Sequence, residues 1–252
     1  MRVAIGQIDS FLSRDNLQKH LDIIKNTDAD LIIFPELSLN GYLLQDKLFE
    51  DAYLIDELEE IQNASYNIDI VVGAALKDND LIYNAGLYFS KGQLLHIHKK
   101  NHLPNYGMFE EARFFSRSNT IDGFKTNYGI GVILVCEDLW NGNTISRLAK
   151  IMPDFVLVIS NSPARDFQED GLLIQQQWEA LLKSAALLAK SNIIFVNRIG
   201  FEDGIGFWGG SMVISAKAEI LHKMPFFDEK IDIVKINQQK YKVQKMIFKH
   251  DE

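Results

Sequence analysis

The sequence predicts an α/β fold with a mixed β-sheet, or with two stacked sheets that carry helices on their outer faces. Short β-rich runs alternate with amphipathic helical stretches, which is typical of parallel strands joined by helices. Three further runs, at 68–75, 81–89 and 94–98, follow one another without a helix and therefore predict antiparallel hairpins. No linker rich in Pro, Gly or Ser divides the 252 residues, so we expect one domain over 1–252.

The helices are predicted from apolar residues that recur with a period near 3.6. The clearest helix, at 172–190, places Ile174, Trp178 and Leu182 on one stripe, which indicates a core helix or a subunit interface. The remaining helices are expected, in chain order, at 15–25, 48–62 and 144–151.

The strands are predicted from short runs of aliphatic and β-branched residues. Residues 31–34 are apolar throughout, as expected of a strand buried on both faces. The polar tail at 238–252 is expected to form either a docking arm or a frayed end. Besides the three hairpin runs, strands are expected at 3–8, 31–34, 131–135, 155–159, 193–196, 212–215, 220–223 and 231–236.

The composition argues against several classes of protein. The chain is 47% hydrophobic and 24% charged, as in ordinary globular proteins. Its net charge of −8, without a basic block, argues against nucleic acid as a partner, because phosphate binding favours positive charge. No apolar run approaches the roughly 18 residues of a membrane span, and the N-terminus is typical of a strand rather than a signal peptide. Because the lone cysteine cannot form an internal disulfide, a cytoplasmic location is expected.

Three segments place reactive side chains just after a predicted buried strand. Glu36, Lys100 and Cys136 each lie at the end of such a strand. The carboxyl ends of strands are where open α/β sheets usually bind ligands. These three side chains can act together only if the three strand ends converge.

The chemistry of Cys136 depends on its neighbours. A lone cysteine is often a small buried apolar residue, but here Glu137 and Asp138 follow directly, which is unusual for a core position. A cysteine where a strand turns toward a helix can lie near backbone N–H groups that stabilise a thiolate or an oxyanion. Free cysteine is mostly protonated at neutral pH, so a nucleophilic Cys136 requires a base and a cation. Glu36 and Lys100 are candidates, although each alone is compatible with a solvated surface side chain.

The three segments resemble the signature blocks of the nitrilase superfamily of carbon–nitrogen hydrolases. Residues 34–42 resemble its F-P-E-x-x-x-x-G-Y block, 100–103 its K-x-H-L block and 136–140 its C-x-D-x-W block. Their order and spacing fit over nearly the whole chain. The resemblance implies a four-layer αββα sandwich, in which helices flank two mixed sheets, and assembly into a homodimer or a higher homo-oligomer. It implies neither a cofactor nor a metal.

The resemblance also implies a role for each residue. Cys136 matches the nucleophile, Glu36 the general base and Lys100 the cation beside the tetrahedral intermediate. Glu111 matches a second carboxylate that positions the substrate and the lysine, and Lys100 is expected to keep both carboxylates ionised. A small-molecule amide or N-carbamoyl substrate would form a thioester on Cys136 and release ammonia.

One branch of the superfamily is closer than the others. Residues 100–115 are similar to the glutaminase domain of glutamine-dependent NAD synthetase, which carries P-N-Y-G-x-F-D-E-x-R-Y-F. The sequence lacks an S-G-G-x-D nucleotide loop, and residues 197–211 resemble stand-alone amidases. We therefore favour an amidase or N-carbamoyl-type hydrolase over a glutaminase-type subunit that supplies ammonia to a separate synthetase. Substrate contacts are expected from Tyr42, Tyr106, Phe109, Glu137, Ser162 and Arg165, the last being the only cation in residues 164–170, directly after the Ser-Pro pair.

Three alternatives stay open. His96, His98 and His102 form H-x-H-x-x-x-H, which suits a metal site, but no acidic partner segment completes it. Residues 204–209 fit G-x-G-x-x-G without the strand before and helix after that dinucleotide binding requires, so we expect a strand-edge loop closing over the pocket. A catalytically silent binding or scaffold protein is the third alternative, and the three intact blocks argue against it.

Overall fold

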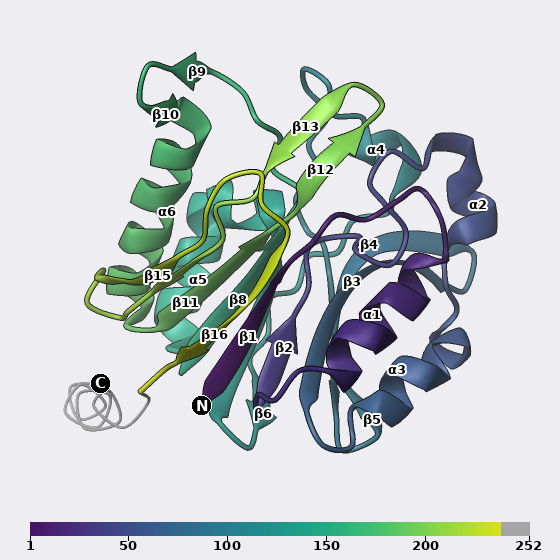
Figure 1. Ribbon diagram of the computed structural model, residues 1–252, viewed down its shortest axis with the longest axis horizontal. Helices are drawn as coiled ribbons and strands as arrows, with labels where there is room; N and C mark the ends of the chain where they lie inside the picture. Colours follow the sequence, from purple (N-terminus) through teal and green to yellow (C-terminus); the bar gives the residue numbers. More distant parts are fainter. Residues whose placement is uncertain (238–252) are drawn as a thin grey trace.

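The computed structural model describes residues 1–237 and contains two six-stranded sheets that face each other between layers of helices (Figure 1). The tail at 238–252 lies outside the described residues. The first sheet has the order β16 (Lys230–Lys235), β1 (Arg2–Gln7), β2 (Leu31–Ile33), β3 (Asp69–Asp78), β4 (Leu81–Ser90) and β5 (Gln93–Lys99). The second has the order β15 (Ile220–Lys223), β14 (Met212–Ile214), β11 (Asn192–Asn197), β8 (Phe155–Ser160), β7 (Gly129–Val135) and β6 (Phe124–Thr126).

Both sheets are mixed. In the first sheet β1, β2 and β3 are parallel, whereas β4, β5 and β16 pair antiparallel. In the second sheet β7, β8 and β11 are parallel, whereas β6, β14 and β15 pair antiparallel. The central parallel strands are apolar almost throughout because both of their faces are buried. Of the two predicted architectures, the stacked sheets are confirmed.

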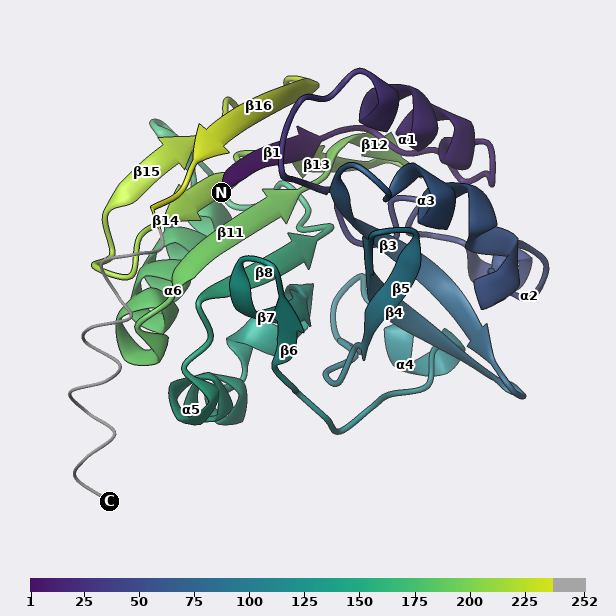
Figure 2. The same ribbon diagram turned by 90° about the horizontal axis from the view of Figure 1, so that it is seen from below.

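Helices cover the outer face of each sheet (Figure 2). The first sheet is covered by α1 (Asn16–Lys25) and α3 (Glu59–Ala64), and the second by α5 (Gly142–Ile151) and α6 (Leu173–Ala189). The apolar stripe predicted for α6 packs on the second sheet through Trp178 and Leu182. The resulting layers are those of the predicted αββα sandwich.

The predicted helix at 48–62 is wrong, because the structure divides it. The segment forms α2 (Leu48–Asp51), the 3₁₀ helix η2 (Ile55–Leu58) and α3, with an extended Tyr53 between the first two. Because β2 is short, the C-terminal half of β3 lacks a partner on that side. Tyr53 supplies it: its N–H donates to the Ala75 carbonyl at 2.8 Å, and its carbonyl accepts from Lys77 at 2.8 Å.

The glycine-rich stretch at 204–209 belongs to a β-hairpin rather than to a loop. Strands β12 (Ile199–Glu202) and β13 (Ile205–Trp208) pair, with Gly204 at the turn and a positive φ of 78°. A strand, β14, follows instead of a helix, so the dinucleotide fingerprint lacks its context. Other elements not predicted are η1 (Gln45–Lys47), α4 (Glu111–Phe114), β6, η3 (Cys136–Trp140), β9 (Phe167–Gln168) and β10 (Gly171–Leu172). None of the helices within residues 1–237 has the length and apolarity needed to cross a membrane.

Gly86 on β4 lies where the two sheets meet, and we expect Gly86→Ala to destabilise the fold. An added Cβ would lie 2.7 Å from Ile133 Cγ2 and 3.2 Å from Ile159 Cδ1. Overpacking of this kind costs about 1–3 kcal/mol in the free energy of unfolding, which urea denaturation measures. The matched control is Gly142→Ala, because a Cβ there meets nothing within 4 Å. Equal stability of the two variants would contradict tight packing between the sheets.

Candidate active site

The ends of four strands, two from each sheet, meet at one place. Glu36 and Lys100 follow β2 and β5 of the first sheet, and Cys136 and Asn161 follow β7 and β8 of the second. The backbone N–H of Asn161 donates to Glu36 Oε2 at 2.8 Å and so joins the two sheets. The three strand ends that carry Glu36, Lys100 and Cys136 therefore converge.

Glu36 is fully buried and its carboxylate is held from three sides. Asn84 Nδ2 and Lys100 Nζ both lie 2.7 Å from Oε1, and the Asn161 N–H binds Oε2. The strand ends before it at Pro35, which cannot donate a ladder hydrogen bond. Gly73 on β3 lets this turn pack closely, since a Cβ there would meet the backbone of Pro35 and Leu37.

Lys100 is a fully buried ammonium between two carboxylates. Its Nζ lies 2.7 Å from Glu36 Oε1 and 2.7 Å from Glu111 Oε1. Burial alone would lower the pKa of Lys100, but the attraction of Glu111 and Glu36 overrides it and raises the pKa well above its ordinary value. Lys100 therefore stays positively charged.

Glu111 begins α4 and is held by Tyr42 as well as by Lys100. The Tyr42 hydroxyl donates to Glu111 Oε1 at 2.6 Å. Burial and the repulsion from Glu36 outweigh Lys100 and raise the pKa of Glu111 to about 7. Glu111 is therefore only partly ionised near neutral pH, which departs from the expectation that Lys100 keeps both carboxylates ionised.

Cys136 occupies a strained turn between β7 and η3. Its φ of 44° is left-handed, which costs a residue with a Cβ on the order of 1 kcal/mol or more. Its Sγ accepts a hydrogen bond from Ser160 Oγ at 3.2 Å. Burial and the nearby Glu36 raise the pKa of the Cys136 thiol well above its ordinary value, and Lys100 compensates only in part. The resting group is therefore a neutral thiol that needs a base.

Asp138 ties the lysine segment to the cysteine turn. Its Oδ1 accepts the backbone N–H groups of Asn101 at 2.9 Å and His102 at 3.0 Å, and its Oδ2 accepts that of Val135 at 3.1 Å. His98 Nε2 lies 2.8 Å from Oδ2. Burial opposes the shift, but the hydrogen bonds from the His102 and His98 side chains, together with the Val135 N–H, lower the pKa of Asp138 below its ordinary range.

The three histidines of the H-x-H-x-x-x-H motif have other partners. His98 and His102 both contact Asp138, and His96 stacks on Phe124 with ring centroids 4.3 Å apart. Within residues 1–237, no group of three or more His, Cys, Asp and Glu side chains is arranged to hold a metal ion.

Three aromatic side chains, Tyr42, Tyr106 and Phe109, contact one another beside the cluster, and their role as substrate contacts stays a prediction. Phe109 lies edge-on to Tyr106 and Tyr42, with centroids 5.5 Å and 6.4 Å apart. The Tyr106 hydroxyl donates to both Glu137 oxygens, at 3.0 Å and 3.1 Å. Burial and Glu137 raise the pKa of Tyr106 to about 12, although the nearby Arg165 opposes this shift. Glu137 and Arg165 thus place opposite charges around one half-exposed phenol.

Ser162 is placed differently from the expectation. Its buried hydroxyl accepts the indole N–H of Trp178 at 2.9 Å and of Trp208 at 3.2 Å. Its backbone N–H donates to Asn197 Oδ1 at 2.8 Å. The hydroxyl oxygen and the backbone N–H therefore both support the turn after Asn161, and the role of Ser162 as a substrate contact stays a prediction.

Two asparagines of the cluster were missed in the sequence. Asn84 binds Glu36, and the side chain of Asn161 is 1% exposed with neither amide atom bonded to any residue in 1–237. Buried amides without partners are rare, so Asn161 has the property expected of a ligand contact. The available signal was a polar residue within an apolar strand for Asn84, and one directly after such a strand for Asn161.

Glu202 on β12 is a positioning residue that no motif indicated. Its carboxylate accepts the backbone N–H groups of Tyr42 and Leu43. Arg198, fully buried, donates to Glu202 Oε2 at 2.6 Å and to Asp9 Oδ1 at 3.2 Å. The β12–β13 hairpin thereby fixes the segment whose Tyr42 holds Glu111.

A family model described as carbon-nitrogen hydrolase matches residues 2–245. The chain belongs to this carbon–nitrogen hydrolase family, as its three sequence blocks predicted. It is similar to the glutamine-dependent NAD(+) synthetase of Acinetobacter baylyi, with 31% identity over 248 residues that cover 94% of this chain and 43% of the relative. The enzyme of that name from Thermotoga maritima is 27% identical over 94% of this chain and 42% of the relative. The chain thus spans less than half the length of these relatives.

Solved structures share the fold. The glutamine-dependent NAD+ synthetase from Acinetobacter baumannii aligns with a TM-score of 0.82 at 30% identity, over 95% of this chain and 46% of that chain. A carbon-nitrogen hydrolase from Helicobacter pylori G27 aligns with a TM-score of 0.88 at 21% identity, over 100% of this chain and 95% of that chain. A mutant amidase of the nitrilase superfamily from Nesterenkonia AN1 aligns with a TM-score of 0.79 at 18% identity, over 99% of this chain and 95% of that chain. The predicted four-layer fold is confirmed.

We expect Glu111 to make the protein less stable as the pH rises from 4.5 to about 7. Its pKa is 4.5 ordinarily and about 7 in the fold, so the folded state retains a proton that the unfolded chain has lost. The stabilisation is complete below pH 4.5 and is lost as the pH rises through 7. Glu111→Gln should flatten the pH dependence of the free energy of unfolding in urea. Glu110→Gln, an exposed neighbour, is the control, and parallel curves for wild type and Glu111→Gln would refute the assignment.

Proposed function

We propose that this member of the carbon–nitrogen hydrolase family cleaves a small-molecule amide or N-carbamoyl bond through a thioester on Cys136. The observation that carries the proposal is the buried cluster in which Glu36 and Lys100 bond directly and both act electrostatically on the Cys136 thiol. A base, a cation and a nucleophile from three distant segments are the groups that amide hydrolysis without a cofactor needs.

The first half of the reaction moves one proton within the cluster. Glu36 takes the thiol proton, and the Cys136 sulfur attacks the carbonyl carbon. Because the negative charge passes from Glu36 to sulfur, the net charge of the buried site does not change. Lys100 and the backbone N–H of Glu137 stabilise the oxyanion, and Glu36 returns the proton to the departing ammonia or amine.

The second half releases the acid. Glu36, again ionised, takes a proton from water, and the hydroxyl oxygen attacks the thioester carbon. When the tetrahedral intermediate collapses, the carbon–sulfur bond breaks, the carboxylic acid leaves and the thiol regains its proton from Glu36. Tyr42, Glu111 and Asn84 keep Lys100 and Glu36 in place through both halves.

Glutamine is a second candidate substrate that a specific observation favours. Arg165 has a buried Nε without a hydrogen-bond partner in residues 1–237, and both Arg165 and Glu137 lie near enough to Tyr106 to act on its hydroxyl. An α-carboxylate on Arg165 and an α-ammonium on Glu137 would orient the side-chain amide of a free amino acid. The named relatives are glutamine-dependent. We infer that the chain could act as a glutaminase-type subunit that supplies ammonia to a separate synthetase.

Assembly and location complete the proposal. We propose a single domain over 1–252 that forms a homodimer or a higher homo-oligomer in the cytoplasm. Support for assembly comes from α6, where Leu187 and Leu188 are 54% and 57% exposed on the outside of the second sheet.

Replacing the nucleophile should abolish turnover. We expect Cys136→Ala to lower the rate of ammonia release by about 1,000-fold or more, with an unchanged circular dichroism spectrum. The assay uses aliphatic amides, N-carbamoyl amino acids and glutamine. Retained turnover would refute the thioester route. If no amide reacts and iodoacetamide labels Cys136 no faster than a model thiol, the silent scaffold alternative holds instead.

Arg165→Gln should distinguish glutamine from simple amides. Loss of one charge-assisted hydrogen bond lowers kcat/KM for glutamine by about 10- to 100-fold and leaves propionamide hydrolysis unchanged. Arg113→Gln, which removes an exposed arginine outside the approach, is the matched control. An equal effect on both substrates would exclude carboxylate recognition by Arg165.

A further inference from the structure

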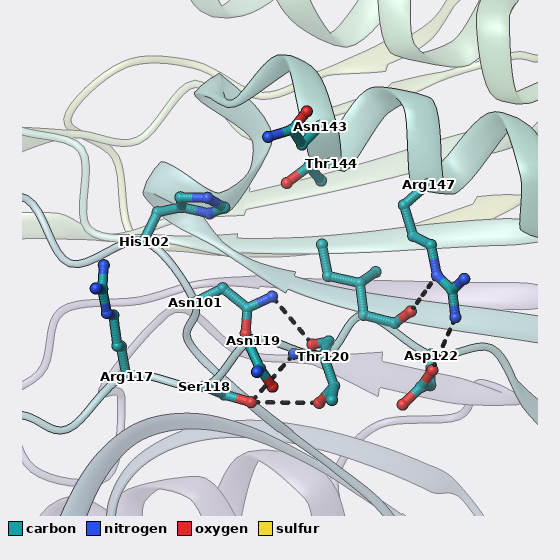
Figure 3. A pocket seen from close by; sticks show the side chains of 11 residues that line it. Asn101, His102, Arg117, Ser118, Asn119, Thr120, Asp122, Asn143, Thr144 and Arg147 are labelled. Carbon is teal, nitrogen blue, oxygen red and sulfur yellow. Dashed lines mark hydrogen bonds and ion pairs between the residues drawn. The ribbon is translucent and has the colours of Figure 1, made fainter.

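A polar cavity of about 750 Å³ lies beside the N-terminus of α5, separate from the cluster around Cys136 (Figure 3). Its walls come from the segment after Lys100, from residues 117–122 ahead of β6, and from the first turns of α5. None of the four predicted catalytic residues is among its lining residues. We call it the α5 pocket and define it by Asn101, His102, Arg117, Asp122, Thr144 and Arg147.

Two buried polar atoms at this cavity have no hydrogen-bond partner within residues 1–237. They are the hydroxyl of Thr144, a residue only 1% exposed, and Oδ1 of Asn101, a residue 7% exposed. Figure 3 shows the Thr144 side chain directed toward the cavity. The Nδ2 of Asn101 donates to the Thr120 carbonyl oxygen at 3.0 Å, and Oδ1 remains as an acceptor. Since buried polar groups are normally paired, these two atoms indicate a ligand that both accepts and donates hydrogen bonds.

The charges around the cavity favour an anion. Arg117 makes no ion pair with any residue in 1–237. Arg147 donates from Nε to the Ile121 carbonyl at 3.0 Å and from Nη2 to Asp122 at 3.2 Å. Within residues 1–237 its Nη1 remains as a donor for a ligand. Figure 3 shows the two arginines at opposite ends of the cavity. The N-terminus of α5 adds a positive dipole end, and Asp122, the one acidic lining residue, is already paired.

From these contacts we propose that the α5 pocket binds a small anionic metabolite. The ligand carries more than one oxyanion group, carboxylates or phosphate esters, which contact Arg117 at one end of the cavity and Arg147 at the other, and one of them reaches the Thr144 hydroxyl. A neighbouring hydroxyl or N–H group of the ligand donates to Asn101 Oδ1. The net charge of the chain is −8, so this pocket differs in sign from the protein as a whole.

The pocket is connected to the catalytic segments through Asp138. Both Asn101 and His102 donate backbone N–H groups to Asp138, and His102 Nδ1 lies 3.3 Å from the same oxygen. Asn101 directly follows Lys100, and Asp138 lies two residues after Cys136. A ligand that orders Asn101 and His102 therefore also fixes Lys100 relative to Cys136. Any effect of the bound ligand on the rate of hydrolysis rests on the proposed function, whereas binding of the ligand to the α5 pocket does not.

Calorimetric titration with inorganic phosphate and with L-malate, at constant ionic strength set by chloride, tests the site. We expect saturable binding of at least one probe to wild type and, equally, to Cys136→Ala. Arg117→Gln should weaken it by about tenfold or more and the nearly isosteric Thr144→Val by about threefold or more. Arg113→Gln is the control and should bind like wild type.

The two probes distinguish the ligand sources. Binding of phosphate alone assigns a phosphate ester, and binding of malate alone assigns a hydroxycarboxylate. Absence of saturable binding for both probes, or binding that Arg117→Gln and Thr144→Val leave unchanged, would overturn the proposal. Because the titration measures binding without turnover, its result can be interpreted even if the hydrolase assay fails.

Discussion

The buried ammonium of Lys100 is the interaction on which the site depends. Removing such a charge from water costs several kcal/mol, which is regained only if its partners are close and themselves held. Nζ meets Glu36 and Glu111 at 2.7 Å each. The carboxylate at the end of β2, Glu36, is held in turn by Asn84 and Asn161. The carboxylate on α4, Glu111, is held by Tyr42. The charge is therefore stable only while these segments remain together.

The same cluster explains why a neutral thiol is an advantage. A standing thiolate at the partly exposed Cys136 would face Glu36 and, when it is ionised, Glu111, with one ammonium to balance them. Keeping the proton on sulfur until a carbonyl group is present avoids that repulsion. The left-handed turn at Cys136 aims the side chain from the end of β7, and Asp138 anchors that turn to the lysine segment.

Local patterns were sufficient for the parts of the fold that are themselves local. The apolar runs and the α6 stripe predicted most of the strands and the outer helices, but they left one mixed sheet and two stacked sheets open. The resemblance of the strand-end blocks to a known family implied the two sheets and the meeting of Glu36, Lys100 and Cys136. The break at Tyr53 depends on how far β2 extends beside β3, which no periodicity encodes. The indole partners of Ser162 were not predicted because they lie 16 and 46 residues away. Glu202 was missed because 160 residues separate it from Tyr42.

The shared hydroxyl of Ser162 has an optical consequence. Two of the three tryptophans in the sequence, Trp178 and Trp208, donate to this one oxygen. Ser162 is bonded covalently to Asn161, whose N–H holds Glu36. Any movement of that turn alters the polarity around both rings at once. The indole emission is thus an intrinsic probe of the region next to the nucleophile, and no label has to be attached.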